Sequence, residues 1–476
     1  MENTAIQNKK RWWALSILCL GVLMIVLDTT IVNVALPSIR TSLGFGEASL
    51  AWVVNAYLLT FGGFLLLGGR LGDLYGHRRV FLSGLVIFTL ASLACGFAGS
   101  QWFLIVARAI QGIGGAVVNA VALSLMMNLF TEPGDRAKAM GVFGFVAAGG
   151  GSIGVLLGGL LTTINWHWIF LVNIPIGIVV FIFSFWLLPA TRLEDAQKHL
   201  DVPGAVTLIA SLVLANYAIV NGNIVGWMTF QTLGLLALAV ILLALFIWIE
   251  SRARVPLMPL RLFRLRNVVT ANAAGVLWAA AMFSWFFISA LYMQFVLGYS
   301  PLQVGLAFLP ANLIMAAFSV GLSAKIIMRY GIKRPLWTGL TSASLGLVLL
   351  AFAPIGGHFV ANILPSMILL GIGAGIAFNP ILLVAMSDLP QAESGLASGL
   401  VNTSFMMGGA LGLAILASLA LARTESLVQS GTTHLVALNA GYHAAFLVGA
   451  SFAALAAILG VVFLKVPARG VESSAV

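Results

Sequence analysis

Long apolar stretches separated by short polar breaks dominate this chain. A helix needs about 20 apolar residues to cross the hydrocarbon core of a bilayer. The sequence predicts fourteen such helices, at 12–36, 49–69, 80–99, 102–130, 137–161, 168–189, 203–221, 228–249, 269–297, 304–328, 336–354, 359–387, 394–421 and 441–465. Only 8% of the residues are charged, against about 25% in soluble domains, so we expect a multi-pass membrane protein.

The basic residues test this count, because cytoplasmic loops of membrane proteins are enriched in Lys and Arg. Of the 24 Lys and Arg residues, all except Arg40, Arg108 and Arg423 fall in breaks that fourteen helices would place on one side. The alternation predicts a cell-membrane protein, typical of a bacterial inner membrane, with both termini in the cytoplasm. The net charge is +10, but the basic residues recur at alternate membrane boundaries and are not gathered in one domain. We therefore expect no nucleic-acid partner.

An internal repeat divides the chain into two halves. Arg70–Gly84 recurs as Lys325–Gly339, and Gly112–Gly114 recurs as Gly371–Gly373. Such parallel repeats are typical of transporters built from two similar bundles. We therefore expect an all-α membrane fold in three parts: a six-helix half at 12–189, two inserted helices with their linkers at 190–268, and a second six-helix half at 269–465.

One acid and one base are expected inside the membrane, Asp28 in the first apolar stretch and Arg108 in the fourth. A lone charge in hydrocarbon costs several kcal/mol, so each of these side chains must be neutralised, paired or exposed to a water-filled cavity. Asp28 is therefore a candidate proton or cation site; the alternative is a neutral carboxyl bonded to a neighbouring helix. Arg108 retains its proton, and we expect its partner to be Asp28, backbone carbonyls or Gln111.

Four segments carry a family resemblance: Gly69–Arg79, Leu104–Gly114, Leu27–Pro37 and Trp166–Gly177. The first resembles the loop motif between helices two and three of the major facilitator superfamily. The second resembles its helix-four motif with a buried arginine. The other two resemble signatures of the fourteen-helix drug:proton antiporter family within it.

The resemblance implies export of lipophilic or cationic compounds, such as dyes and quaternary ammonium biocides, in exchange for protons. It favours proton coupling through Asp28 and Arg108. Because Asp28 is the one acid expected inside the membrane, one proton per cycle is the simplest expectation, unless a loop-edge acid, Asp388 or Glu393, takes part. It also implies a gating motif, whose basic members are equally explained as ordinary cytoplasmic charge. The motif comprises Gly69, Arg70, Asp73, Gly76, Arg78 and Arg79. Asp73 can cap a helix N-terminus or pair with an Arg, and Asp135 and Arg136 are the expected partners of Asp73 and the three arginines.

The fifth helix is rich in glycine, which lets helices approach closely. We expect four of these glycines to pack against a helix of the other half: Gly150, Gly154, Gly158 and Gly159. The family motif places a proline before its glycine pair here, and this chain has none.

Polar and aromatic residues inside the apolar stretches are candidates for a substrate cavity, although aromatic and Met side chains in membranes more often face lipid or the core. The candidates are Asn33, Asn55, Tyr57, Gln111, Asn119, Trp285, Tyr292, Gln294, Phe378, Asn379, Asn402 and Met406. Amides are costly in hydrocarbon unless partnered, which favours a polar cavity for them.

Neither a nucleotide-binding loop nor a cluster with metal-ligand spacing is evident in the sequence, and no nucleophile–base pair presents itself. We therefore expect a monomeric transporter rather than an enzyme or sensor, with no cofactor. Its partners would be small-molecule substrates, protons and lipid. The alternative function is transport of a single natural metabolite in either direction.

Overall fold

The computed structural model describes residues 2–189, 201–253, 256–318, 322–387 and 394–464, and every regular element within them is a helix. The chain divides into two compact units. Unit 1 comprises residues 1–257 and 299–306, and unit 2 comprises 258–298 and 307–476. A helix satisfies its backbone groups internally, which is what an apolar chain in a bilayer requires.

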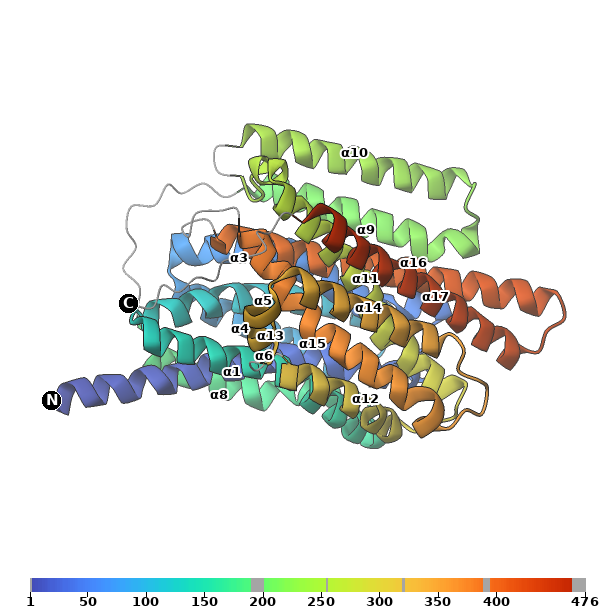
Figure 1. The fold of residues 1–476 in the computed structure, drawn as a ribbon, viewed down its shortest axis with the longest axis horizontal. Coiled ribbons are helices and arrows are strands. Elements are labelled where there is room, and N and C mark those ends of the chain that lie inside the picture. Colours follow the sequence, from blue (N-terminus) through green and yellow to red (C-terminus); the bar gives the residue numbers. More distant parts are fainter. Residues whose placement is uncertain (1, 190–200, 254–255, 319–321, 388–393, 465–476) are drawn as a thin grey trace. The chain divides into compact units, whose positions relative to one another are not determined.

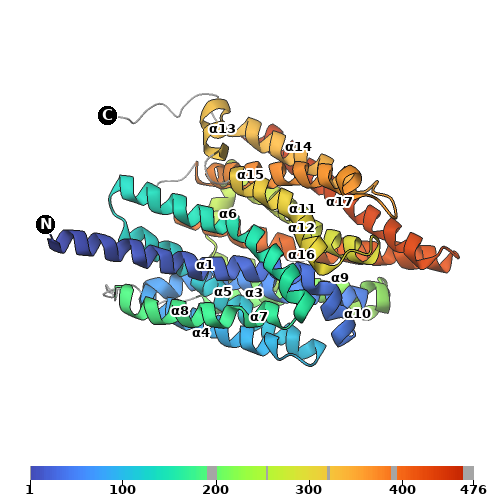
Figure 2. The same cartoon turned by 90° about the horizontal axis from the view of Figure 1, so that it is seen from below.

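Unit 1 contains ten complete helices in its described part. They are α1 (Glu2–Leu43), α2 (Glu47–Leu50), α3 (Trp52–Tyr75), α4 (His77–Gly96), α5 (Gln101–Leu129), α6 (Pro133–Ile164), α7 (Trp168–Leu171), α8 (Asn173–Leu187), α9 (Val202–Val225) and α10 (Phe230–Arg252). Figure 2 shows α1 running alongside α6 and α8, both of which it contacts. In Figure 1, α9 and α10 lie side by side as a hairpin.

Unit 2 is also helical throughout its described part, and α12 begins in the short segment that groups with unit 1. The elements are η1 (Leu260–Arg264), α11 (Arg266–Phe295), α12 (Pro301–Ala317), α13 (Ser323–Tyr330), α14 (Lys333–Leu350), η3 (Phe359–Ile363), α15 (Leu364–Met386), α16 (Ser394–Gln429) and α17 (His434–Phe463). Within it, α11 contacts α15, α16 and α17, and α14 contacts α15 and α17.

Twelve helices of the described residues are long and apolar enough to cross a membrane, whereas the sequence predicts fourteen. The two remaining spans, 304–328 and 336–354, correspond to α12 with α13 and to α14. α12 has only 17 residues, and α14 begins with Lys333 and Arg334, which lower the mean hydropathy of its 18 residues. The count of fourteen is therefore not confirmed, although each predicted span contains a helix.

Two glycines of α5 set its position between α3 and α4. A Cβ at Gly112 would lie 2.5 Å from the carbonyl oxygen of Tyr57 on α3, and one at Gly114 would lie 2.5 Å from the backbone nitrogen of Phe88 on α4. No side chain fits at either contact, so the three backbones approach as closely as helices can. This packing holds the preceding turn of α5, which carries Arg108 and Gln111, close to the neighbouring helices.

Three of the four α6 glycines pack against α1 of the same unit, whereas the sequence predicts contact with a helix of the other half. A Cβ at Gly158 would lie 2.8 Å from the carbonyl oxygen of Ile31, and one at Gly154 would lie 3.1 Å from that of Leu27. Gly150 meets the side chains of Leu23 and Val26 on the same helix. Gly159 meets the backbone of Pro301 and Leu302, in the segment grouped with unit 1.

Candidate functional site

Asp28 lies in the interior of unit 1, with no exposed surface, and both of its carboxyl oxygens accept hydrogen bonds. Arg108 Nη1 donates to Oδ2 at 2.5 Å. Oδ1 accepts from Gln111 Nε2 at 2.7 Å and from Asn173 Nδ2 at 3.2 Å. A carboxylate removed from water is tolerated only when paired and hydrogen-bonded in this way. One polar centre therefore joins four helices: α1, α5, α8 and, through its contacts with Arg108, α3.

Arg108 is 1% exposed and makes several further contacts. Its Nε donates to the carbonyl oxygen of Val53 on α3 at 3.0 Å, and its Nη1 donates to Gln111 Oε1 at 2.7 Å. The guanidinium also lies over two aromatic rings, 4.4 Å from the centroid of Tyr57 and 5.7 Å from that of Phe170. All three partners that the sequence suggests for Arg108, namely Asp28, a backbone carbonyl and Gln111, are present together.

Gln111 connects the charged pair to α4. Its Nε2 donates to Ser92 Oγ at 2.8 Å, and its Oε1 accepts from Cys95 Sγ at 3.7 Å. Gln111 and Arg108 are three residues apart on α5, so their side chains share a face of the helix. The Gln111 amide donates to the Asp28 carboxylate and accepts from the Arg108 guanidinium. It therefore orients these two groups relative to each other.

Sequence reasoning missed Asn173 and Ser92. Asn173 lies inside the segment Trp166–Gly177, and an amide within an apolar run is the sequence signal that would have found it. The structure buries this side chain fully. Ser92 gives no such signal, because a single serine in a transmembrane helix commonly bonds its own backbone.

The expected gating residues lie at the junction of α3 and α4. Gly76, with φ of 89°, ends α3 and begins the turn into α4, a conformation that side-chain-bearing residues rarely adopt. Asp73 lies 3.3 Å from His77 Nε2 and 4.0 Å from Arg70 Nη1, and it is 53% exposed. Arg78 donates to the carbonyl oxygen of Phe185 and lies over its ring.

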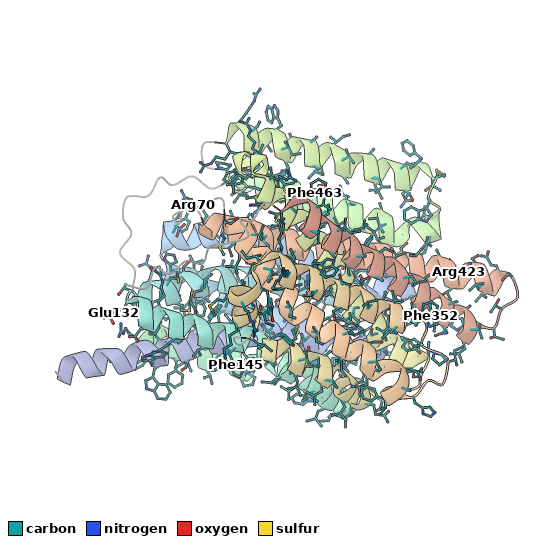
Figure 3. All side chains as sticks on the ribbon, viewed as in Figure 1. Arg70, Glu132, Phe145, Phe352, Arg423 and Phe463 are labelled. Atoms are coloured by element: carbon teal, nitrogen blue, oxygen red, sulfur yellow. The ribbon has the colours of Figure 1, made fainter. Side chains whose placement is uncertain are left out.

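Asp135 and Arg136 contact residues other than Asp73, contrary to the expected pairing. Asp135 lies 3.4 Å from Arg11 Nη2 and 4.0 Å from Lys138 Nζ. Arg136 Nε donates to Met127 Sδ at 3.2 Å. Figure 3 places Arg70 and Glu132, which precedes α6, at the same end of unit 1. Asp73 has Arg70 and His77 as its basic neighbours there, in place of the expected Arg136.

The cavity candidates of unit 1 divide by their surroundings. Tyr57 and Gln111 belong to the polar centre. Asn55 donates from Nδ2 to Asn216 Oδ1 at 2.9 Å, joining α3 to α9 in the interior. Asn33 donates to the carbonyl oxygen of Thr29 on its own helix. Asn119 is half-buried on α5.

The candidates of unit 2 do not converge on a charge. Tyr292 donates to the carbonyl oxygen of Pro354 at 3.1 Å, and Asn379 donates to Ser323 Oγ at 3.3 Å. Asn402 donates within its own helix, to the carbonyl oxygen of Ser398. Phe378 packs 5.1 Å from the ring of Phe405.

Three other candidates of unit 2 are Trp285, which is buried, and Gln294 and Met406, which are half-buried. Asp388 and Glu393, the acids expected at a loop edge, lie outside the described residues.

A buried acid–base pair in a bundle of apolar helices, beside a Gly-rich turn with charged residues, is what the sequence resemblance implies. A family model described as Major Facilitator Superfamily matches residues 18–413. The chain belongs to the Major Facilitator Superfamily. It is a multi-pass membrane transporter, and the sequence prediction of the family is confirmed.

Relatives of this major facilitator carry the names of resistance and export proteins. The puromycin resistance protein pur8 of Streptomyces alboniger is 36% identical over 449 residues, covering 93% of this chain and 89% of the relative. The cephamycin export protein CmcT of Amycolatopsis lactamdurans is 39% identical over 407 residues, covering 85% and 84%. The solved structure of the POT family transporter PepTSo matches with a TM-score of 0.69 at 17% identity, covering 94% of this chain and 97% of that one, which supports the fold alone.

Proposed function

We propose that this major facilitator exports lipophilic and cationic compounds, including drugs, dyes and quaternary ammonium compounds, in exchange for protons. The observation that carries the proposal is the buried pair of Asp28 and Arg108, 2.5 Å apart in unit 1. The names of the relatives, puromycin resistance and cephamycin export, support efflux as the direction.

Asp28 is the proton carrier of the proposed cycle. In its charged form the carboxylate is held by Arg108, Gln111 and Asn173. A proton on Asp28 removes the charge that Arg108 faces, and the guanidinium then depends on Val53, Gln111 and the aromatic rings alone. A conformation that offers Arg108 other partners gains stability only when Asp28 is protonated, so proton binding shifts the conformational equilibrium.

The turn between α3 and α4 is the proposed gate. Asp73, Arg70 and Arg78 make contacts within unit 1, and rearrangement of such exposed ion pairs costs little energy. We propose that these contacts, with those of Asp135 and Arg136, differ between the two access states, and that the gate lies on the cytoplasmic side together with both termini. The proposed transporter is a monomer in a bacterial inner membrane. We propose that α12 and α14 also cross the bilayer, which gives fourteen transmembrane helices.

A second candidate function is export of a single natural compound. It is favoured by relatives that are each named for one antibiotic, puromycin, cephamycin or tetracenomycin C. Resistance to many unrelated compounds in a drug-sensitive host that overproduces the protein would favour the first proposal. Resistance confined to one chemical class would favour the second.

Proton release from purified protein on addition of substrate tests the coupling. We expect wild type to release protons when tetraphenylphosphonium binds, and Asp28→Asn to bind it without releasing them. Glu132→Gln, which alters an exposed acid at the start of α6, is the matched control and should behave as wild type. Proton release by folded Asp28→Asn equal to that of wild type would overturn the proposal.

A further inference from the structure

Two tryptophans of α11 are fully buried without a hydrogen bond. Trp278 and Trp285 are 0% and 1% exposed, and the indole Nε1 of each has no hydrogen-bond partner among the described residues. They are seven residues apart, which puts them on one face of the helix about two turns apart. An indole N–H is a donor only, and buried tryptophans usually find an acceptor for it.

Asn312 of α12 is a third buried group of this kind. It is 1% exposed, and neither Nδ2 nor Oδ1 has a partner in the described part of the chain. It follows Phe308 by one turn, and the ring of Phe308 lies 6.0 Å from that of Trp285. Trp285 and Asn312 therefore lie near the place where α11 meets α12, and Trp278 shares the face of α11 that carries Trp285.

The direction of the helices brings these groups to similar depths. α12 follows α11 after a short connection and runs back along it. From the contact of Trp285 with Phe308, Asn312 lies about 6 Å further along α12, and Trp278 lies about 10 Å back along α11, at 1.5 Å per residue. Both displacements point the same way, so Asn312 lies at a level between the two indoles.

Aromatic rings flank these polar atoms. Trp285 and Phe286 have centroids 4.3 Å apart, and Phe286 and Phe308 stack with 5.4 Å between centroids and 28° between planes. Charge is absent from this surface. Glu425, near the C-terminal end of α16, is the one acid among the described residues of unit 2.

Buried polar groups are hydrogen-bonded in more than about 90% of cases, and an unmade bond costs roughly 1–3 kcal/mol. Three such groups on two neighbouring helices leave two N–H donors and an amide available to a further molecule. Two donors and an amide beside aromatic rings fit a hydrogen-bond acceptor on a flat ring system. A cation could use the aromatic faces by cation–π contact, but it would leave the two indole N–H donors unused, whereas a neutral acceptor uses both features.

We propose that Trp278, Trp285 and Asn312 form a recognition site in unit 2 for uncharged aromatic compounds that carry a carbonyl or similar acceptor. The inference rests on the proposed export function, whose substrate class it extends beyond lipophilic cations. The indole N–H groups and the Asn312 amide donate to the acceptor of the ligand, and Phe286 and Phe308 contact its ring faces.

The test compares two neutral tricyclic probes of nearly the same shape. 9-Fluorenone has a carbonyl acceptor and fluorene has none; tetraphenylphosphonium, a cation without an acceptor, is the third probe. Equilibrium binding to purified protein is measured for wild type, Trp285→Phe and Asn312→Leu. Trp337→Phe, which alters an exposed tryptophan of α14, is the matched control.

We expect wild type to bind 9-fluorenone about tenfold more tightly than fluorene, the ratio typical of one or two neutral hydrogen bonds. Trp285→Phe and Asn312→Leu should each reduce that preference about fivefold, without changing the affinity for tetraphenylphosphonium. Trp337→Phe should change neither.

Two results would overturn the inference. Equal binding of 9-fluorenone and fluorene by wild type would mean that buried water alone supplies the missing bonds. An equal loss of affinity for all three probes in Trp285→Phe and Asn312→Leu would mean that these residues only support packing. The measurement needs no proton gradient, so a failure of proton coupling at Asp28 would leave the expected preference for 9-fluorenone intact.

Discussion

In unit 1 the buried acid and base are paired with each other, whereas in unit 2 three neutral buried side chains, Trp278, Trp285 and Asn312, lack partners within the described residues. Asp28 and Arg108 satisfy each other with help from Gln111 and Asn173. Trp285 and Asn312 leave their N–H groups unused. A charge cannot be left unpaired in such an interior, but a neutral donor can, at a cost that a ligand is able to recover.

The internal repeat makes this difference more specific. Gly112 of α5 corresponds to Gly371 of α15, so Arg108 corresponds to Met367 and Gln111 to Leu370, both fully buried. The close helix packing is kept, since a Cβ at Gly371 would lie 2.6 Å from the carbonyl oxygen of Ala311. The two halves therefore share a packing arrangement, and in the part of the chain that the structure describes only the first half has a charged centre.

Replacing Arg108 by Met, the residue that unit 2 has at this position, should have the largest effect on stability. It leaves the Asp28 carboxylate buried without its counter-charge, and we expect the free energy of unfolding to fall by about 3–5 kcal/mol. Asp28→Asn in the same chain should recover part of the loss. Chemical denaturation in detergent measures both, with Arg334→Met at an exposed position as the control. A loss below about 1 kcal/mol would contradict the charged character of the centre.

Removing one amide from each unit compares their polar groups directly. Gln111→Leu breaks bonds to Asp28, Arg108 and Ser92, and should lower the free energy of unfolding by about 3 kcal/mol. Asn312→Leu breaks no bond within the described residues and should leave it unchanged or raise it slightly. The same denaturation experiment applies, and equal losses for the two variants would erase the contrast between the units.

Adding one methyl group to the packing glycines tests what the units share. Gly112→Ala and Gly371→Ala should each lower the free energy of unfolding by about 2 kcal/mol, because the added Cβ meets a carbonyl oxygen of the facing helix. Gly141→Ala on α6, where nothing lies within 4 Å, should be neutral or slightly stabilising. The comparison is by thermal unfolding of purified protein. A large effect in one unit only would show that the repeat does not extend to packing.

The site was partly predictable. Asp28, Arg108 and Gln111 follow from the sequence, because charges and amides inside apolar stretches must find one another or water. Asp73 and Asp135 have partners here that the sequence did not predict, since exposed charges have several partners of similar energy within reach. The partner of Gly150, Gly154 and Gly158 was also predicted wrongly, because a stripe of small residues indicates close packing without saying which helix fills it.

The amino-acid sequence by itself determined that the chain enters a membrane, which family it belongs to and which residues carry charge there. These are local properties: the length of an apolar stretch, the residues of a motif and the cost of a charge in lipid. Only the tertiary structure decided that Asn173 and Ser92 complete the charged centre and that Trp278, Trp285 and Asn312 lack partners. Those facts depend on how closely the helices approach and how each helix is rotated about its axis. Backbone contacts at glycines such as Gly112 and Gly371 set both, and they join segments that are far apart in the chain.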